Sequence, residues 1–177
     1  MLETDGADDL TLALLAERAG VSKPIAYDHF QSKSGLLIAL LEDTSRYYET
    51  DAEAKIAAAP ATVPAIAEIV ATAYVNCAIE AGPATTTLAA AAEADSEARK
   101  AGRALQSRHA DSFAQAFAPV LEDDHPRLHL LFRGLVAASN AICDDRTQNR
   151  ITTEAAIETL RHLLVTSLTP FARTTLH

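Results

Sequence analysis

Hydrophobic residues recur along this chain every three to four positions, in segments separated by glycine, proline or short polar runs. Spacing of this kind places the apolar side chains on one face of an α-helix, whereas a half-buried strand would show strict alternation. No alternating stretch stands out, and alanine, which favours helices, is frequent. The pattern therefore predicts an all-α protein.

Two short helices joined by a tight turn are predicted near the amino end. Thr11 can cap the first helix, and apolar residues follow it at helical spacing. Gly20 stands where a helix end needs a residue that tolerates positive φ. Ser22 can cap the second helix, and Pro24 lies in its first turn, where a missing N–H costs nothing. This arrangement predicts a helix-turn-helix, the unit that places its second helix in the DNA major groove.

Periodicity alone also fits two core helices around an ordinary loop, so the residue types have to decide. Residues 16–23 form the run AERAGVSK, and the residues that follow include Tyr27, His29, Phe30, Ser32 and Lys33. This pattern closely resembles the signature of the tetracycline-repressor (TetR/AcrR) family of transcriptional regulators. The resemblance covers about the first 45 residues; the rest of the chain resembles the family in length and helical character.

The resemblance implies a helix-turn-helix DNA-binding domain over residues 1–45 and a larger helical domain for ligand binding and dimerisation over residues 46–177. It also implies that most of the family's first helix is absent, because only residues 1–3 match its tail, and residues 4–9 are predicted to form an acidic loop. Either the natural reading frame begins farther upstream, or this protein has lost the helix. Without it, we expect exposure of the side chains that it would cover: Leu12, Leu15, Val21 and Phe30.

The recognition helix is predicted over residues 23–29, with its first residues toward the base edges. Lys23 could donate to guanine O6 and N7, and Ile25 could contact a thymine methyl group. In the family, the residues that match Tyr27 and His29 contact DNA, although a tyrosine at the core edge and a surface histidine are the alternatives. The full set of expected DNA contacts is Thr11, Ser22, Lys23, Pro24, Ile25, Tyr27, His29 and Lys33.

The remaining periodic segments predict a helical body. Helices are expected over about residues 33–58, 63–81 (ended by Gly82-Pro83), 96–122 (distorted at Pro119), 123–143 (started by Asp123–Pro126) and 153–170, with a short alanine-rich segment over 85–94 and a polar loop over 144–150. In the family the last two long helices pair with their copies across a two-fold axis, although a face buried within one chain would look the same. Such a homodimer presents two recognition helices about one DNA turn apart, as a palindromic operator requires.

The resemblance further implies a pocket for a small-molecule effector inside the body. Polar side chains inside an apolar body are the most informative candidates, since they need partners. Ordinary core packing explains each candidate equally well. The expected pocket residues are Tyr74, His109, Phe113, Phe117, Phe132 and Asn140. An effector there would release DNA by changing the separation of the two DNA-binding domains.

Charge and composition narrow the range of partners. The formal net charge of −9 counts against indiscriminate binding to nucleic acid, so any DNA contact must be local and geometric. Cys77 and Cys143 lie in apolar helical surroundings and are expected to be free thiols. No uninterrupted apolar run approaches about 18 residues, which predicts a cytoplasmic protein without a membrane partner.

No catalytic constellation emerges from the sequence. Glu122 and His125 have the spacing of one helical di-iron pair, but the second pair is missing. His125 and His129 lie four residues apart, yet Pro126 favours surface roles for them over metal binding. We therefore expect no enzyme, cofactor or metal, but a homodimeric, ligand-responsive regulator that is typically a repressor. The alternative is a helical small-molecule-binding dimer that has lost DNA binding.

Overall fold

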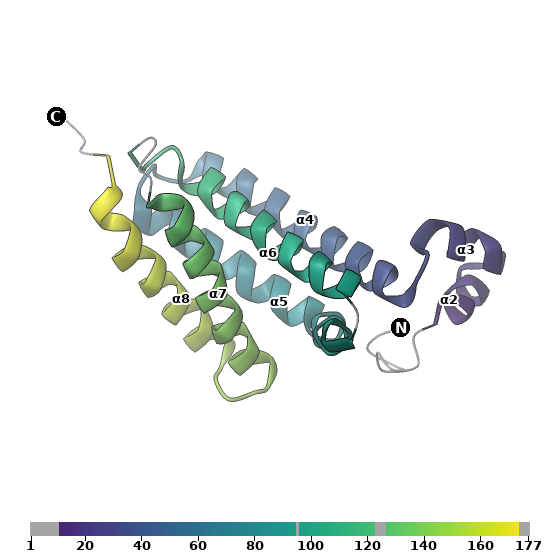
Figure 1. The fold of residues 1–177 in the computed structure, drawn as a ribbon. Coiled ribbons are helices and arrows are strands. Elements are labelled where there is room, and N and C mark those ends of the chain that lie inside the picture. Colours follow the sequence, from purple (N-terminus) through teal and green to yellow (C-terminus); the bar gives the residue numbers. More distant parts are fainter. Residues whose placement is uncertain (1–10, 95, 123–126, 174–177) are drawn as a thin grey trace. The chain divides into compact units, whose positions relative to one another are not determined.

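The computed structural model describes residues 11–94, 96–122 and 127–173 (Figure 1). Every regular element within these ranges is helical, which confirms the predicted all-α class. The α-helices are α2 (Leu12–Ala19), α3 (Lys23–Phe30), α4 (Lys33–Ala58), α5 (Val63–Ala94), α6 (Ser96–Phe117), α7 (Leu128–Thr147) and α8 (Thr153–Leu168), followed by the 3₁₀ helix η1 (Thr169–Phe171). The predictions for residues 1–9 and for Asp123–Pro126, including His125, lie outside the described residues.

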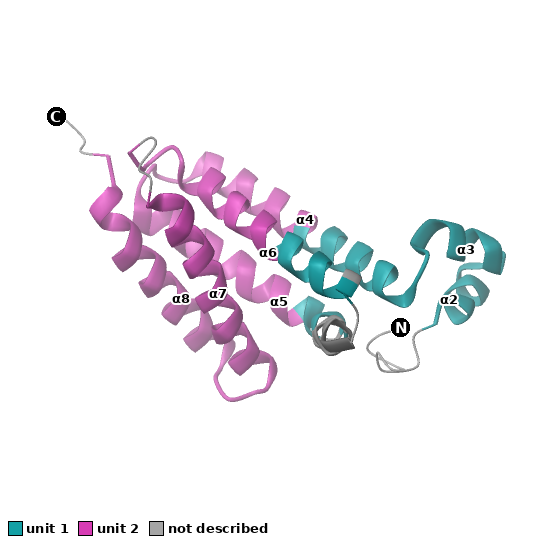
Figure 2. Cartoon of the chain, viewed as in Figure 1, with its two compact units in different colours: residues 1–45, 80–105 teal, residues 46–79, 106–177 magenta. Residues whose placement is uncertain are grey.

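The chain divides into two compact units, which are coloured separately in Figure 2. Unit 1 comprises Met1–Ser45 and Glu80–Leu105, and unit 2 comprises Arg46–Ile79 and Gln106–His177. Helices α4, α5 and α6 therefore each contribute residues to both units. The functional division predicted at residue 45 stays a prediction, because compactness reports packing and not function.

The helix-turn-helix of unit 1 forms where the sequence predicts it. The backbone N–H of Leu14 donates to Thr11 Oγ1 over 3.1 Å, so Thr11 caps α2. Gly20 closes the helix at φ 67°, in the left-handed region. Leu12 and Ala16 form the buried side of α2.

The joint between α3 and α4 is unusually tight. Gln31 has φ 61° and ψ −39°, and the N–H of Ser32 donates to the carbonyl of Phe30 over 2.6 Å, which makes a three-residue γ-turn. Ser32 then caps α4 by accepting from the N–H of Gly35 over 3.0 Å. A Cβ atom at Gly35 would lie 2.0 Å from the Phe30 carbonyl oxygen, so only glycine fits without displacement of the backbone.

The core of unit 1 joins the helix-turn-helix to α4. Its buried side chains are Leu12, Leu36, Leu37, Leu41, Ala81, Ala84 and Ala98, with Leu15, Phe30, Ile38 and Leu105 partly buried against them. The expectation that Leu12 is exposed was therefore wrong: its side chain is 4% exposed, because residues of α4, α5 and α6 share this cluster. Val21 is exposed, as expected.

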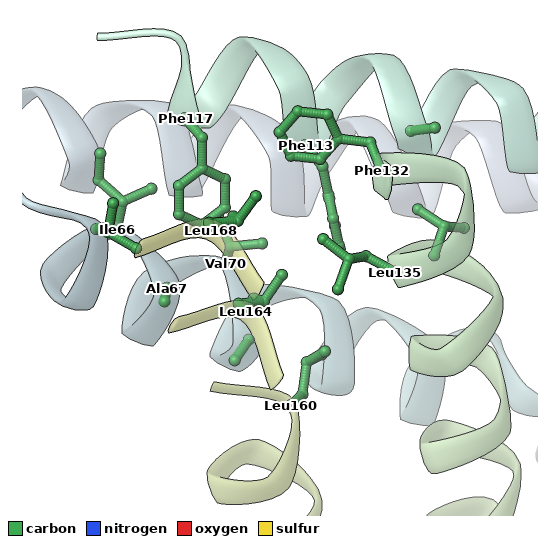
Figure 3. Close-up of a cluster of buried hydrophobic side chains, with 14 of the residues drawn as sticks. Ile66, Ala67, Val70, Phe113, Phe117, Phe132, Leu135, Leu160, Leu164 and Leu168 are labelled. Atoms are coloured by element: carbon green, nitrogen blue, oxygen red, sulfur yellow. The ribbon is translucent and has the colours of Figure 1, made fainter. Parts of the chain in front are cut away.

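The core of unit 2 brings α5, α6, α7 and α8 together (Figure 3). Leu160, Leu164 and Leu168 form the inner stripe of α8 and have no exposed area. Thr152 caps this helix by accepting from the N–H of Ala155. The stacked rings of Phe117 and Phe132 have centroids 6.4 Å apart.

Three predicted helix ends were wrong. Helix α5 continues through Gly82-Pro83, because Ala81 and Ala84 on either side are both buried in the core of unit 1 and their burial opposes a break. Helix α6 ends at Phe117 and not at Glu122. Here Val120 and Leu121 turn inward, and the N–H of Glu122 donates to the Phe171 carbonyl over 2.9 Å. Helix α7 runs one turn beyond Cys143, to Thr147, so the polar loop is shorter than predicted.

Within the described residues, Val63–Gly82 in α5 is long and apolar enough to cross a membrane on length and composition alone. The segment contains the carboxylates of Glu68 and Glu80. Its buried side chains in unit 2, among them Ile66, Val70 and Val75, belong to the apolar core. Core packing therefore accounts for part of the apolar character of this segment.

The tight joint gives a stability prediction. Gly35→Ala should destabilise the protein by about 2 kcal/mol, because the added methyl group meets a backbone carbonyl that cannot move aside cheaply. Gly102→Ala is the matched control: Gly102 is also helical and in unit 1, but nothing lies within 4 Å of its added Cβ. It should stabilise the protein by up to about 1 kcal/mol. Urea unfolding measures both, and equal effects would contradict the close approach at Gly35.

Candidate functional site

Helix α3 turns one small side chain inward and leaves the others exposed. Ala26 is 2% exposed, whereas Ile25 and Tyr27 on either side of it are 57% and 50% exposed. Seven of the eight expected DNA-contact residues are exposed, and the eighth, Lys33, is half-buried. The structure therefore brings these residues to the surface of unit 1 without testing their roles.

Three helices of unit 1 begin at expected DNA contacts. Thr11 is the N-cap of α2, Ser22 that of α3, and Lys33 is the first residue of α4. Unpaired N–H groups and the helix dipole favour anions at such ends. The Thr11 hydroxyl accepts the capping bond and, like any hydroxyl, can donate at the same time.

Ser22 does not cap α3 as predicted. It occupies the N-cap position, but its side chain makes no capping hydrogen bond. An N-cap oxygen bonds the N–H of the second or third helical residue. The second residue is Pro24, which has no N–H, so one of the two possible capping hydrogen bonds cannot form.

Local charge in the helix-turn-helix is weakly positive. Between residues 17 and 33, Arg18, Lys23 and Lys33 stand against Glu17 and Asp28, three cations to two carboxylates. The apolar side chains of Val21 and Ile25 add exposed surface, at 41% and 57%. A surface that mixes exposed apolar groups with cations is better suited to specific contact with DNA than to non-specific binding of polyanions.

A partly buried polar cluster lies in unit 2, between helices α5, α6 and α7. The Tyr74 hydroxyl on α5 donates to Asn140 Oδ1 on α7 over 2.8 Å and lies 3.4 Å from His109 Nδ1 on α6. The Tyr74 ring meets the rings of His109 and Phe113 edge to face, with centroids 5.4 and 5.2 Å apart. The structure thus brings together four of the six expected pocket residues, while Phe117 and Phe132 stack on each other.

Burial keeps this cluster uncharged. It raises the pKa of Tyr74, with the nearby Cys143, Cys77 and Asp144 adding to the effect. It lowers the pKa of His109 to about 4, and the cation of Arg108 adds to that shift. Burial also raises the pKa of Cys143 to about 12, so this free thiol stays protonated at neutral pH.

Sequence reasoning missed Glu49 on α4. In the described part of the chain its Oε1 is buried without a hydrogen-bond partner. Burial raises the pKa of Glu49, against the opposing effects of a hydrogen bond with Ser112 and the cation of Arg108. A glutamate in an amphipathic helix gives no sequence signal of such burial, because it depends on how α4 packs.

Metal binding finds no support in the described part of the chain. It contains no group of three or more His, Cys, Asp or Glu side chains that could hold a metal ion. His129 is exposed on α7.

The buried imidazole gives a pH prediction. Because folding lowers the pKa of His109 from 6.5 to about 4, the unfolded chain binds the proton more readily between these values. The free energy of unfolding should fall from pH 6.5 to 4, by at most about 3 kcal/mol from this group. Urea unfolding of His109→Gln should show a smaller fall, whereas His162→Gln, at an exposed position, should match the natural chain. An unaltered pH dependence for His109→Gln would contradict the buried neutral imidazole.

Comparison with known proteins agrees with this geometry. Residues 1–40 match the model of the family described as bacterial regulatory proteins, tetR family. No curated protein matches the chain.

Solved structures share the fold over nearly the whole chain. A protein from Rhodococcus sp. assigned to the TetR family superposes with a TM-score of 0.67 at 22% identity, over 94% of this chain and 92% of that one. A TetR transcriptional regulator from Rhodococcus sp. RHA1 gives 0.71 at 16% identity, over 91% and 85%. A TetR transcription regulator from Haloarcula marismortui gives 0.62 at 17% identity, over 97% and 92%.

The family match falls on the helix-turn-helix, and the structural likeness extends through the helical body. Residues 1–40 thus match the tetR family of bacterial regulatory proteins, and the chain shares its fold with solved structures described as TetR-family transcriptional regulators.

Proposed function

We propose that this protein is a homodimeric transcriptional repressor that binds a palindromic operator and responds to a small-molecule effector. The observation that carries the proposal is the outward face of α3, where Lys23, Ile25 and Tyr27 are exposed while Ala26 is buried. The family and fold support a regulator rather than an enzyme. Its place of action is then the cytoplasm, where bacterial DNA lies.

The proposed division of labour on DNA follows from position. Lys23 and Ile25 lie in the first turn of α3, the end of a recognition helix that meets base edges. Lys23 donates to guanine O6 and N7, and Ile25 contacts a thymine methyl group. Thr11, Ser22 and Lys33, at three helix starts, bind phosphates and hold the helix in register. Pro24, Tyr27 and His29 complete the contact face.

The proposed dimer interface lies on α7 and α8. Leu130 is 66% exposed, and Gly134, Ala137 and Ala141 follow it at helical spacing, all exposed. A Cβ at Gly134 would meet nothing within 4 Å in its own chain, so packing within the chain does not require glycine there. Small side chains on an outer helix face allow a second helix to approach closely. A two-fold pairing here would supply the second recognition helix.

The rival function is a small-molecule-binding dimer that no longer binds DNA. The net charge of −9 favours it, because phosphate binding depends on cations. A mobility-shift assay of the full chain against the DNA upstream of its own gene, with and without a longer reading frame, separates the two functions. A specific shift supports the regulator, and no shift with either frame supports the rival.

The lysine roles can be separated by mutation. Lys23→Ala should relax the preference at one operator position by about 1–3 kcal/mol, whereas Lys33→Ala should weaken binding to all sequences alike and reduce the salt slope by about one. Lys55→Ala, which removes an exposed lysine paired with Asp51 in unit 2, is the control and should change neither. Equal losses on every sequence for Lys23→Ala and Lys33→Ala would refute these roles.

The proposed interface predicts that the same substitution has different effects on dimerisation at two glycines. Gly134→Glu should convert the dimer to a monomer in analytical ultracentrifugation, because a carboxylate would be buried at the close approach of α7 and its copy. Gly102→Glu places the same side chain on a helix in equally open space and should leave the dimer intact. Circular dichroism should show both variants folded. A dimeric Gly134→Glu variant would exclude this face as the interface.

A further inference from the structure

The cluster around Tyr74 is a polar contact inside an otherwise apolar core. Side chains from three helices meet there, and the surrounding core consists of residues such as Val75, Phe113 and Val136. Ser139, which is also buried, bonds the Leu135 carbonyl of its own helix and so links no two helices by that bond. The Tyr74–Asn140 bond, by contrast, connects α5 to α7.

The chemistry of this cluster is neutral. It offers a phenol hydroxyl, a carboxamide and an imidazole, with the thiols of Cys77 and Cys143 nearby. The charged groups that act on it, Asp144 and Arg108, are both exposed. A charged molecule entering here would lose its hydration without gaining a buried counter-ion, which is strongly unfavourable.

We propose that the effector engages the protein at the Tyr74–Asn140 hydrogen bond, and that it is an uncharged, largely apolar molecule bearing a hydroxyl group. This inference rests on the proposed function, since it names the chemistry of the effector. A hydroxyl inserted between the two side chains accepts from the Tyr74 O–H and donates to Asn140 Oδ1, so both partners stay satisfied. A ketone can only accept, and it leaves Asn140 Oδ1 without a donor. Separation of Tyr74 from Asn140 moves α5 relative to α7, which links binding to the helices of the body.

Four eight-carbon probes test this proposal: 1-octanol, 2-octanone, octanoate and octylammonium. Calorimetric titration of the full chain should rank octanol first, with octanone about tenfold weaker and both ions weaker still. Asn140→Leu keeps the approximate shape of the side chain but removes Oδ1, the acceptor that only octanol can satisfy, and it should abolish the preference for octanol over octanone. Tyr47→Phe is the control at an exposed position, because Tyr47 is 69% exposed, and it should leave the ranking unchanged. Thermal unfolding of both variants verifies that they fold.

Three results would overturn the inference: either ion binding as tightly as octanol, a preference for octanol over octanone that is unaffected by Asn140→Leu, or no binding of any probe. A mobility-shift assay on the same preparations separates this inference from the proposed function. Octanol binding whose selectivity depends on Asn140, without DNA binding, sustains the inference and overturns the regulator. DNA binding by a protein that does not discriminate among the four probes sustains the regulator and overturns the inference.

Discussion

The position of α3 depends on the packing beneath it, because a helix of eight residues is not stable alone in water. Its inner face supplies little area, since Ala26 is its one buried side chain. The position of the helix is therefore fixed from its ends: by Gly20 before it, and by the tight joint at Gln31 and Gly35 after it. Leu12 connects the motif to the leucines of α4. Because α3 is held at its ends and buries only Ala26, almost its whole outer face is available for contact.

An exposed contact face on α3 suits a protein whose net negative charge is repelled by DNA. With a net charge of −9, the chain cannot rely on a broad positive field. In the proposed complex with DNA, the cations near helix starts and the exposed face of α3 act instead through geometry, which gives specificity more than affinity. In unit 2, by contrast, the apolar core is joined across α5 and α7 by the neutral contact of Tyr74 with Asn140.

Local signals predicted the elements that local chemistry determines. Thr11, Gly20, Ser32 and Thr152 cap or close their helices as the sequence indicates, because each interaction spans only a few residues. The wrong helix end at Gly82-Pro83 arose where burial outweighs local preference, whereas the Ser22 cap of α3 failed for a local reason, since Pro24 has no N–H. Burial of Leu12 also depended on partners in other helices. The expected cluster of Tyr74, His109, Phe113 and Asn140 did assemble, whereas the buried oxygen of Glu49 left no trace in the sequence.

The central claim is that two copies of α3 enter one face of a DNA duplex together. A hydroxyl-radical footprint of the full chain on the DNA upstream of its gene measures this directly. The account predicts two symmetric protected regions with centres about 34 Å, or one helical turn, apart. A single unsymmetric region, or uniform protection along the duplex, would contradict it.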